Sequence, residues 1–310
     1  MTHLKTLDGT PASRFAFGTM QFGGNADESA SAEMFDASRA AGINHFDTAF
    51  IYTGGASETI LGKLAAKARE QLLIATKVAY DGNGDPEKLQ ADFDVSLDRL
   101  GLQSVDILYL HMYVGTDLQR ALEWMVKQQA KGKIRYIGLS NFAAWQVMAA
   151  IAIAKQLGTQ IDILQPMYNL VKRQAEVEIL PMCLNQGVAC APYSPLGGGL
   201  LTGKYANGGA GRIKTDQRYS ERYSLPYMAQ TAAELSQLAA ELDVNPATLA
   251  AAWVARHDTA PMPILSARSA QQLTPSLDAI TFQMDDDLYK RIAALSPAPP
   301  PATDRWEERA

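Results

Sequence analysis

Eight short apolar segments, rich in β-branched residues, alternate with longer segments of helical period along this chain of 310 residues. Strands that alternate with helices predict a parallel sheet, because parallel neighbours need a long crossover connection. Eight such units predict closure, so the expected fold is α/β: a single-domain (β/α)8 TIM barrel with a parallel eight-stranded sheet and outer helices. The expected strands are residues 16–20, 44–48, 72–78, 106–111, 134–139, 162–167, 188–193 and 262–266.

An open, doubly wound sheet is the alternative fold for such a pattern. That fold carries Gly-x-Gly-x-x-Gly directly after its first strand. The segment GTMQFGG, residues 18–24, follows the first expected strand and does not have this spacing. Helix signals are clear elsewhere: Asp85, Pro86 and Glu87 supply an N-cap, a first-turn proline and an early acid. The barrel is therefore the better prediction.

Two segments interrupt the alternation. We expect residues 1–296 to form the barrel and residues 297–310, PAPPPATDRWEERA, to form a Pro-rich C-terminal tail. Residues 206–226 follow the seventh expected strand and are too polar and Gly-rich for a core element. Loops of this length are usually functional or mobile. The sequence leaves open whether the loop or the tail closes over a site.

Composition excludes several classes of protein. A formal net charge of −5 argues against a nucleic-acid partner, which needs a positive surface. The longest apolar run, residues 147–154, is far shorter than the ~18 residues that indicate a membrane span. The N-terminal residues MTHLKTLDGT lack the apolar part of a secretory signal. Cys183 and Cys190 have no metal or redox spacing and are expected as buried thiols. We therefore expect a cytoplasmic protein without a membrane partner, whose oligomeric state stays unknown.

Polar residues fall at the ends of three consecutive expected strands. Asp47 ends the second strand and Tyr52 follows it, Lys77 ends the third, and His111 ends the fourth. Taken singly, such residues are usually a turn former, a solvated cation and a hydrogen-bonded core histidine. In barrel enzymes, however, the chemistry is located at the carboxyl ends of the strands. Their joint occurrence there, with apolar residues flanking Lys77 and His111, predicts a catalytic group.

This group suits proton donation to an oxygen. A phenol has an ordinary pKa of ~10 and is a weak donor at neutral pH. We expect the ammonium of Lys77 to lower the pKa of Tyr52, and Asp47 to keep Lys77 charged. His111 can hydrogen-bond the incoming oxygen. Protonating an alkoxide as it forms is what carbonyl reduction requires, and the hydride must come from a cofactor.

The segment GGGLLTGKY, residues 197–205, predicts a phosphate site. From Gly198 it reads Gly-x-x-x-x-Gly-Lys, as in a nucleotide triphosphatase, but Tyr205 replaces the hydroxyl residue that would bind Mg²⁺. It follows the seventh strand, where barrel enzymes commonly hold phosphate. We therefore expect its amides and Lys204 to bind a phosphate group. The four histidines are scattered, so no metal site is expected.

Six sequence blocks occur along nearly the whole chain: GINHFDTAFIY (42–52), ATKV (75–78), LYLHM (108–112), IGLSNF (137–142), LQPMYNLVKRQAE (164–176) and APYSPLGGGLLTGKY (191–205). In this order they resemble the aldo-keto reductase superfamily. The resemblance implies an NADP(H)-dependent reductase of aldehydes or ketones, with NADH possible but weaker. Its catalytic tetrad would be Asp47, Tyr52, Lys77 and His111, with Tyr52 as acid in reduction and base in oxidation. The amides of the glycine segment and Lys204 would bind the dinucleotide pyrophosphate.

The resemblance also implies how the cofactor is held. Ser140, Asn141 and Gln165 match residues that hydrogen-bond the nicotinamide carboxamide, and Tyr193 matches the aromatic that stacks on the ring. Arg268 matches the residue that grips the adenosine 2′-phosphate. The full implied set is Thr19, Met20, Ser140, Asn141, Gln165, Tyr193, Ser194, Leu196, Gly198, Lys204, Ser266, Arg268, Gln272 and Ser276.

Three departures from the family pattern stand out. Thr53 replaces the glycine that usually follows the tyrosine. After the eighth strand, Leu265 and Ser266 replace Pro and Gly, and Ser276 stands where Asn commonly reaches the adenine. The latter changes bear on cofactor affinity and on the strength of the preference for NADPH over NADH, and less on the tetrad.

Other functions stay open. The potassium-channel β-subunits resemble this family, so a regulatory or ligand-sensing barrel subunit that binds NADP(H) with little turnover is the alternative. A lyase or epimerase that uses Lys77 as a Schiff base is a third, and metal-dependent hydrolysis is a weak fourth. Neither the carbonyl substrate nor the physiological direction follows from the sequence. Candidate pocket residues are Met20, Phe22, Phe50, Met112, Tyr113 and, from the tail, Trp306.

Overall fold

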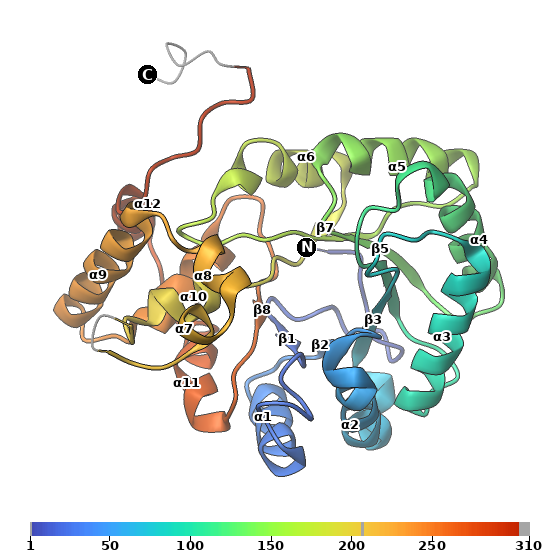
Figure 1. The fold of residues 1–310 in the computed structure, drawn as a ribbon, viewed down its shortest axis with the longest axis horizontal. Helices are drawn as coiled ribbons and strands as arrows, with labels where there is room; N and C mark the ends of the chain where they lie inside the picture. Colours follow the sequence, from blue (N-terminus) through green and yellow to red (C-terminus); the bar gives the residue numbers. More distant parts are fainter. Residues whose placement is uncertain (1, 206–207, 304–310) are drawn as a thin grey trace.

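The computed structural model describes residues 2–205 and 208–303, and it contains all eight expected strands (Figure 1). They pair in parallel in the order β7-β6-β5-β4-β3-β2-β1-β8. Two backbone bonds join the ends of this sheet: the Met262 amide donates to the Cys190 carbonyl (2.7 Å), and the Ile264 amide to the Pro192 carbonyl (2.9 Å). The predicted barrel is confirmed. Its strands are Ala16–Gly18 (β1), His45–Asp47 (β2), Leu73–Val78 (β3), Ile107–Leu110 (β4), Tyr136–Ser140 (β5), Ile163–Gln165 (β6), Ala189–Cys190 (β7) and Ile264–Leu265 (β8).

Helices form a ring around the strands (Figure 1). A helix follows each strand, as expected, but β7 is followed by four, α7 to α10, the first two within residues 206–226, and β8 is followed by α11 and α12. No helix in the described part of the chain is long and apolar enough to cross a membrane. The helices are Glu28–Ala40 (α1), Ala56–Ala65 (α2), Pro86–Leu100 (α3), Leu118–Ala130 (α4), Ala144–Gln156 (α5), Ile179–Gln186 (α6), Arg212–Thr215 (α7), Gln217–Arg222 (α8), Pro226–Glu241 (α9), Pro246–Arg256 (α10), Ala270–Asp278 (α11) and Asp286–Ala294 (α12).

The alternation of side chains along each strand separates two buried regions. Phe17, Phe46 and Ile74 belong to the large apolar cluster between the strands and the helices. Leu73 and Ala75 belong to a second, smaller cluster inside the barrel. Because side chains two apart share a face of a strand, Lys77, two residues after Ala75, also points inward. This rule brings strand-end polar groups into the barrel mouth.

An N-terminal hairpin covers the opposite end of the barrel. Lys5 forms an antiparallel bridge with Pro11, and Leu4 beside it is fully buried. Leu4 packs in the same interior cluster as Leu73 and Ile107, which begin β3 and β4. The sequence did not predict this plug. It closes the end of the barrel away from the chemistry.

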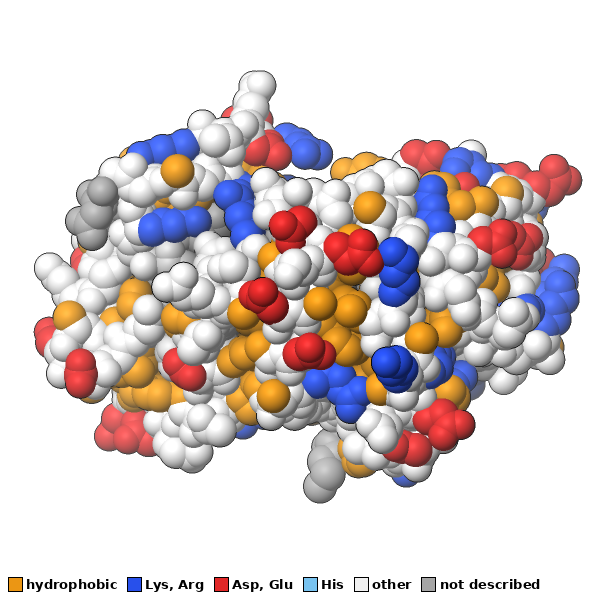
Figure 2. Space-filling model, turned by 90° about the horizontal axis from the view of Figure 1, so that it is seen from below, with side chains coloured by type: hydrophobic (Ala, Val, Ile, Leu, Met, Phe, Trp, Pro, Cys, Tyr) orange, Lys and Arg blue, Asp and Glu red, His pale blue; other side chains and the backbone are white. Residues whose placement is uncertain are grey.

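Charges of both signs are interspersed on the face seen in Figure 2, which views the molecule from below relative to Figure 1. Helices α1 and α2 lie on this side, and Lys63 of α2 pairs with Glu28 of α1 at 2.9 Å. Both side chains are exposed, so the pair contributes at most ~1 kcal/mol. The described residues of this face form no extended field of one charge.

Candidate active site

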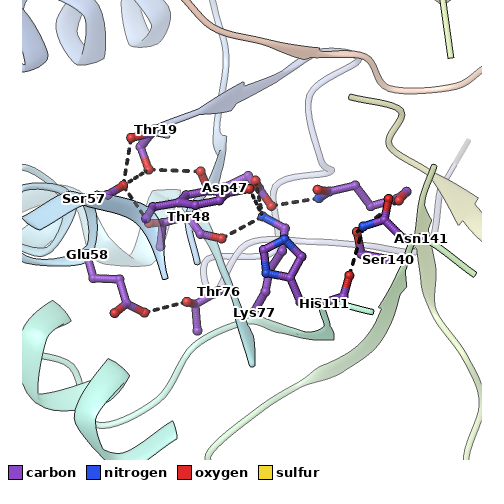
Figure 3. A network of polar contacts seen from close by, with 12 residues as sticks. Thr19, Asp47, Thr48, Ser57, Glu58, Thr76, Lys77, His111, Ser140 and Asn141 are labelled. Atoms are coloured by element: carbon purple, nitrogen blue, oxygen red, sulfur yellow. Dashed lines mark hydrogen bonds and ion pairs between the residues drawn. The ribbon is translucent and has the colours of Figure 1, made fainter. Parts of the chain in front are cut away.

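The amine of Lys77 and the acid of Asp47, predicted at the strand ends, come together at the barrel mouth (Figure 3), and the phenol of Tyr52 lies beside them. Asp47 ends β2 and Lys77 lies on the neighbouring β3. The Lys77 Nζ donates to Asp47 Oδ2 at 2.5 Å and to the Thr48 carbonyl at 2.8 Å. Its third donor reaches the Tyr52 hydroxyl at 3.3 Å. An ammonium has three protons, so these three acceptors use its full hydrogen-bonding capacity.

The Lys77–Asp47 pair is buried. Lys77 is inaccessible to solvent and Asp47 is 2% exposed. Burial lowers the pKa of Lys77, and the neighbouring carboxylate of Asp47 opposes that shift. The second carboxylate oxygen accepts from Gln165 Nε2 at 2.9 Å. Both charges are therefore compensated and hydrogen-bonded, which a buried ion pair requires.

The protonation of Tyr52 differs from the expectation. The sequence argument has Lys77 lowering the pKa of this phenol, but in the structure burial raises it well above its ordinary value, and the charge of Asp47 adds to the rise. Desolvation disfavours the phenolate more than the neighbouring charges favour it. Tyr52 is therefore protonated at neutral pH, as a proton donor must be.

His111 is neutral beside this group. Burial lowers its pKa to about 3, and the positive charge of Lys77 adds to the effect. Its ring packs edge-on against Tyr52 at 5.8 Å and against Tyr80 at 5.0 Å between centroids. Its Nδ1 is buried without a hydrogen-bond partner among the residues described. Aromatic packing thus orients a neutral imidazole that can donate one hydrogen bond.

The residues expected around the nicotinamide lie beside the tetrad. Asn141 donates from Nδ2 to the His111 carbonyl at 3.0 Å and accepts from the Tyr193 hydroxyl at 2.7 Å. Ser140 donates to the Gln165 carbonyl at 3.2 Å. Asn141 has a positive φ of 59°, a conformation that asparagine tolerates better than most residues. Together with the bond from Gln165 to the tetrad carboxylate, these contacts join the expected cofactor face to the catalytic group.

The turn that we expect to bind phosphate is rich in glycine and is surrounded by cations. Gly198 and Gly199 lie in η5, Gly197–Thr202, and have φ of 65° and 91°. A Cβ on Gly199 would lie 2.9 Å from the Lys204 ammonium, so glycine lets this side chain cross the turn. Burial lowers the pKa of Lys204, and the charges of Arg268 and Arg212 lower it further. Three cations therefore share one region, which is suited to a polyanion.

The remaining predicted cofactor residues are placed as follows. The Thr19 side chain is fully buried, bonded to the Asp47 carbonyl at 3.1 Å and the Ser57 hydroxyl at 2.7 Å. Gln272, in the first turn of α11, accepts from the Arg268 amide at 2.9 Å. Ser276 is also in α11 and is buried, whereas Ser266 lies between β8 and α11 and is exposed. Met20 follows β1, and Ser194 and Leu196 follow β7; all three are partly exposed.

The structure adds residues that the sequence argument missed. Arg212 of α7 donates to the Tyr219 hydroxyl of α8 at 2.7 Å, and both Arg212 and Arg222 stack on the Tyr219 ring at 5.1 Å. The charge of Arg212 lowers the pKa of Tyr52, whereas Tyr219 and Tyr80 raise it. Segment 208–222 therefore lies at the site. Its only signal in the sequence was its length and position after the seventh strand.

The predicted pocket residues divide into two groups. Phe22 is wrong as a pocket residue, because it is fully buried and packs on Phe17 at 5.7 Å between centroids. Met20, Phe50, Met112 and Tyr113 stay partly exposed, and Tyr113 packs edge-on against Phe142 and Trp145. Trp306 lies outside the described residues. Cys183 and Cys190 are buried free thiols, as expected.

The sequence and the fold of this chain are similar to those of known oxidoreductases and channel subunits. The model of the aldo/keto reductase family matches residues 14–297. An uncharacterized oxidoreductase of Bacillus subtilis, YrpG, is 32% identical and covers 94% of each chain. A probable voltage-gated potassium channel subunit beta of Oryza sativa subsp. japonica is 29% identical over 96% of this chain and 97% of its own. The structure of the glycerol dehydrogenase AKR11B4 from Gluconobacter oxydans superimposes with a TM-score of 0.79 at 26% identity, covering 92% of both chains.

Proposed function

Because this chain belongs to the aldo/keto reductase family, we propose that it is an NADP(H)-dependent oxidoreductase that reduces aldehydes or ketones to alcohols. The observation that carries the proposal is the polar chain in which Lys77 contacts both the Asp47 carboxylate and the Tyr52 hydroxyl. A protonated phenol next to a buried, compensated ammonium can act as a general acid. A structural neighbour that is a glycerol dehydrogenase, an enzyme named for an alcohol, supports the same chemistry.

Each of the four residues has its own role toward the carbonyl oxygen of the substrate. NADP(H), when bound, supplies a hydride from C4 of the nicotinamide to the carbonyl carbon. Neutral His111 donates a hydrogen bond that orients the oxygen, and Tyr52 gives its proton to the same oxygen as negative charge develops. Lys77 then stabilises the phenolate, and the hydrogen bond to Asp47 holds Lys77 in place. Alcohol oxidation uses the same groups in reverse.

The cation cluster supports the choice of a phosphorylated dinucleotide. Lys204, Arg212 and Arg268 gather within a chain of net charge −5. Concentrating positive charge in this way is useful only if an anion binds there. The pyrophosphate would take Lys204 and the amides of η5, and the 2′-phosphate would take Arg268. The proposed substrate is a small carbonyl compound, and the proposed location is the cytoplasm.

Two alternatives predict different behaviour. A regulatory subunit would bind NADP(H) with little turnover, and the similarity to the Oryza sativa channel subunit favours testing it. Multiple-turnover oxidation of NADPH by a panel of aldehydes and ketones decides between them, because only the reductase consumes many equivalents. The Schiff-base enzyme requires a free amine, whereas all three donors of Lys77 are engaged. Borohydride trapping of a carbonyl adduct on Lys77 would restore that alternative.

A further inference from the structure

We propose that Thr53 and Arg99 are positioning residues that hold the turn carrying Tyr52 from its two flanks. The inference rests on the proposed role of Tyr52 as the acid. The turn, residues 48–57, connects β2 to α2 and includes the first two residues of that helix. In the sheet β2 lies between β1 and β3. Thr53 joins the turn to the segment that follows β1, and Arg99 joins it to α3, which follows β3.

The turn has an unfavourable backbone that needs support. Thr53, Gly54 and Gly55 have successive φ values of 48°, 64° and 100°. For a β-branched residue such as threonine, this left-handed region is strongly disfavoured. Such conformations persist only when surrounding contacts over-determine them. Thr53 stands where the family usually has glycine, so the chain must compensate at this position.

The Thr53 hydroxyl makes that compensation. It donates to the Phe22 carbonyl at 2.8 Å and accepts from the Ser57 amide at 3.0 Å. The first bond ties the turn to the segment after β1, and the second caps the start of α2. Its methyl group packs against Gly24, where an added Cβ would lie 2.8 Å from Thr53 Cγ2. Neither hydroxyl bond is available to a glycine.

Arg99 holds the other flank. Its Nη1 donates to the Phe50 carbonyl at 2.9 Å and to Glu58 Oε2 at 3.2 Å. Its guanidinium lies 4.7 Å above the Phe50 ring and covers Gly55, where a Cβ would be 2.4 Å from Arg99 Cζ. One side chain thus contacts residues on both sides of Tyr52.

Glu58 extends this flank to the strand that carries the ammonium. Its side chain is fully buried, and its Oε1 accepts from the Thr76 hydroxyl at 2.6 Å (Figure 3). Thr76 directly precedes Lys77 on β3. The contacts of Arg99 and Glu58 therefore fix the turn relative to the strand that positions the amine. A small displacement of a reacting group can cost up to about 10²-fold in rate.

The test compares hydroxyl and guanidinium variants with matched controls. Thr53→Ala removes the two hydroxyl bonds, and Thr53→Ser keeps them. Arg99→Lys keeps a charge for Glu58 but loses the planar fork. Arg69→Lys is the control. Arg69 likewise contacts a buried carboxylate, that of Asp106 (2.7 Å), and a carbonyl, that of Leu72 (3.0 Å). These contacts lie at the amino ends of the strands, away from Tyr52. For each variant we would measure kcat, the Kd for NADPH, and hydrogen exchange of residues 48–57.

We expect Thr53→Ala and Arg99→Lys to exchange faster in residues 48–57 and to lower kcat roughly tenfold, with the Kd for NADPH nearly unchanged. Thr53→Ser and Arg69→Lys should stay close to wild type in both readouts. If hydrogen exchange of residues 48–57 is unchanged in these two variants, the contacts of Thr53 and Arg99 do not restrain the turn. Faster exchange with unchanged kcat would overturn the positioning role. A wild type that turns over no carbonyl would refute the proposed function, while hydrogen exchange would still decide whether the restraint exists.

Discussion

At the scale of residues, the protonation of Tyr52 assigns separate roles to the groups around it. Burial raises the pKa of the phenol, so the protein does not prepare a phenolate before reaction. The contact with Lys77 at 3.3 Å gains importance when the proton has left and the oxygen is negative. Asp47 accepts from that ammonium and is itself held by a hydrogen bond from Gln165. Preorganised charge of this kind stabilises the product of proton transfer.

Removing the phenol tests its role directly. Tyr52→Phe should lower kcat by about 10² or more, the usual scale for loss of a general acid. The Kd for NADPH should be unchanged, because the hydroxyl is not needed to hold the cofactor. Steady-state turnover and fluorescence titration of NADPH check the two parts. Near-normal turnover would show that another group supplies the proton.

Arg268 tests the choice of nucleotide. Its fixed positive charge should pair with the 2′-phosphate, which NADH lacks. Losing such a contact typically costs ~1.5–3 kcal/mol, or about ten- to a hundred-fold in affinity. Arg268→Ala should therefore weaken NADPH by that factor and leave NADH nearly unchanged. Equal affinity of the wild type for both nucleotides, in the same titration, would contradict the assignment.

At the scale of elements, glycines allow close packing between η5 and the segment 208–223 that follows it. A Cβ on Gly198 would lie 2.9 Å from the Tyr219 ring and 3.2 Å from that of Tyr223. A Cβ on Gly211 would lie 2.3 Å from the Tyr205 hydroxyl. The helix that carries Arg212 and the turn that carries Lys204 are therefore assembled by close contacts that only glycine permits.

Gly198→Ala should disturb this assembly. The residue has a φ of 65°, so alanine costs ~1–2 kcal/mol in backbone strain and also displaces Tyr219. Tyr219 accepts from Arg212, so its displacement should move Arg212 and remove one proposed contact with the cofactor. Losing one contact of ~1.4 kcal/mol would lower the affinity for NADPH roughly tenfold. Gly132→Ala is the matched control, because its φ is 67° with no atom within 4 Å of the added Cβ. Equal NADPH affinity of the two variants would show that α8 does not support the cofactor site.

At the scale of the whole molecule, two neutral histidines inside the fold make stability depend on pH. Burial lowers the pKa of His45 to about 4 and that of His111 to about 3. Both ring nitrogens of His45 lack a hydrogen-bond partner among the described residues. In the unfolded chain a histidine titrates near pH ~6.5. Between about pH 6.5 and 4 the unfolded state therefore binds more protons, and stability falls as the pH falls.

His45→Leu should reduce this acid sensitivity. Each such histidine can contribute up to about 1.4 kcal/mol per pH unit to the slope of the unfolding free energy. Removing one should flatten the slope between about pH 6.5 and 4.5 without loss of stability at neutral pH, because an orphaned polar group is replaced by an apolar one. Urea unfolding at a series of pH values measures the slope. Parallel curves for wild type and variant would contradict the assigned pKa of His45.

Several features of the protein were predictable from the order of residues. The alternation of strands and helices predicts the barrel, because parallel strands need crossovers. Asp47, Lys77 and His111 lie at or next to the carboxyl ends of β2, β3 and β4, and neighbouring strands of a parallel sheet must bring such residues together. The glycine turn before Lys204 was recognisable because the positive φ of Gly198 and Gly199 favours glycine. These properties depend on neighbours in the sequence or in the sheet.

Only the tertiary structure decided the rest. Leu4 fills the barrel because the N-terminal hairpin folds beneath the strands. Arg212 reaches the site because α7 and α8 pack on η5, which is far from Asp47 and Tyr52 in the sequence. The direction of the Tyr52 pKa shift depends on how much water the whole fold excludes, which no local pattern encodes. Thr53 appears as a departure in the sequence, and its compensating bonds to Phe22 and Ser57 exist only in three dimensions. Periodicity determined the scaffold, whereas desolvation and long-range contacts determined how its residues can act.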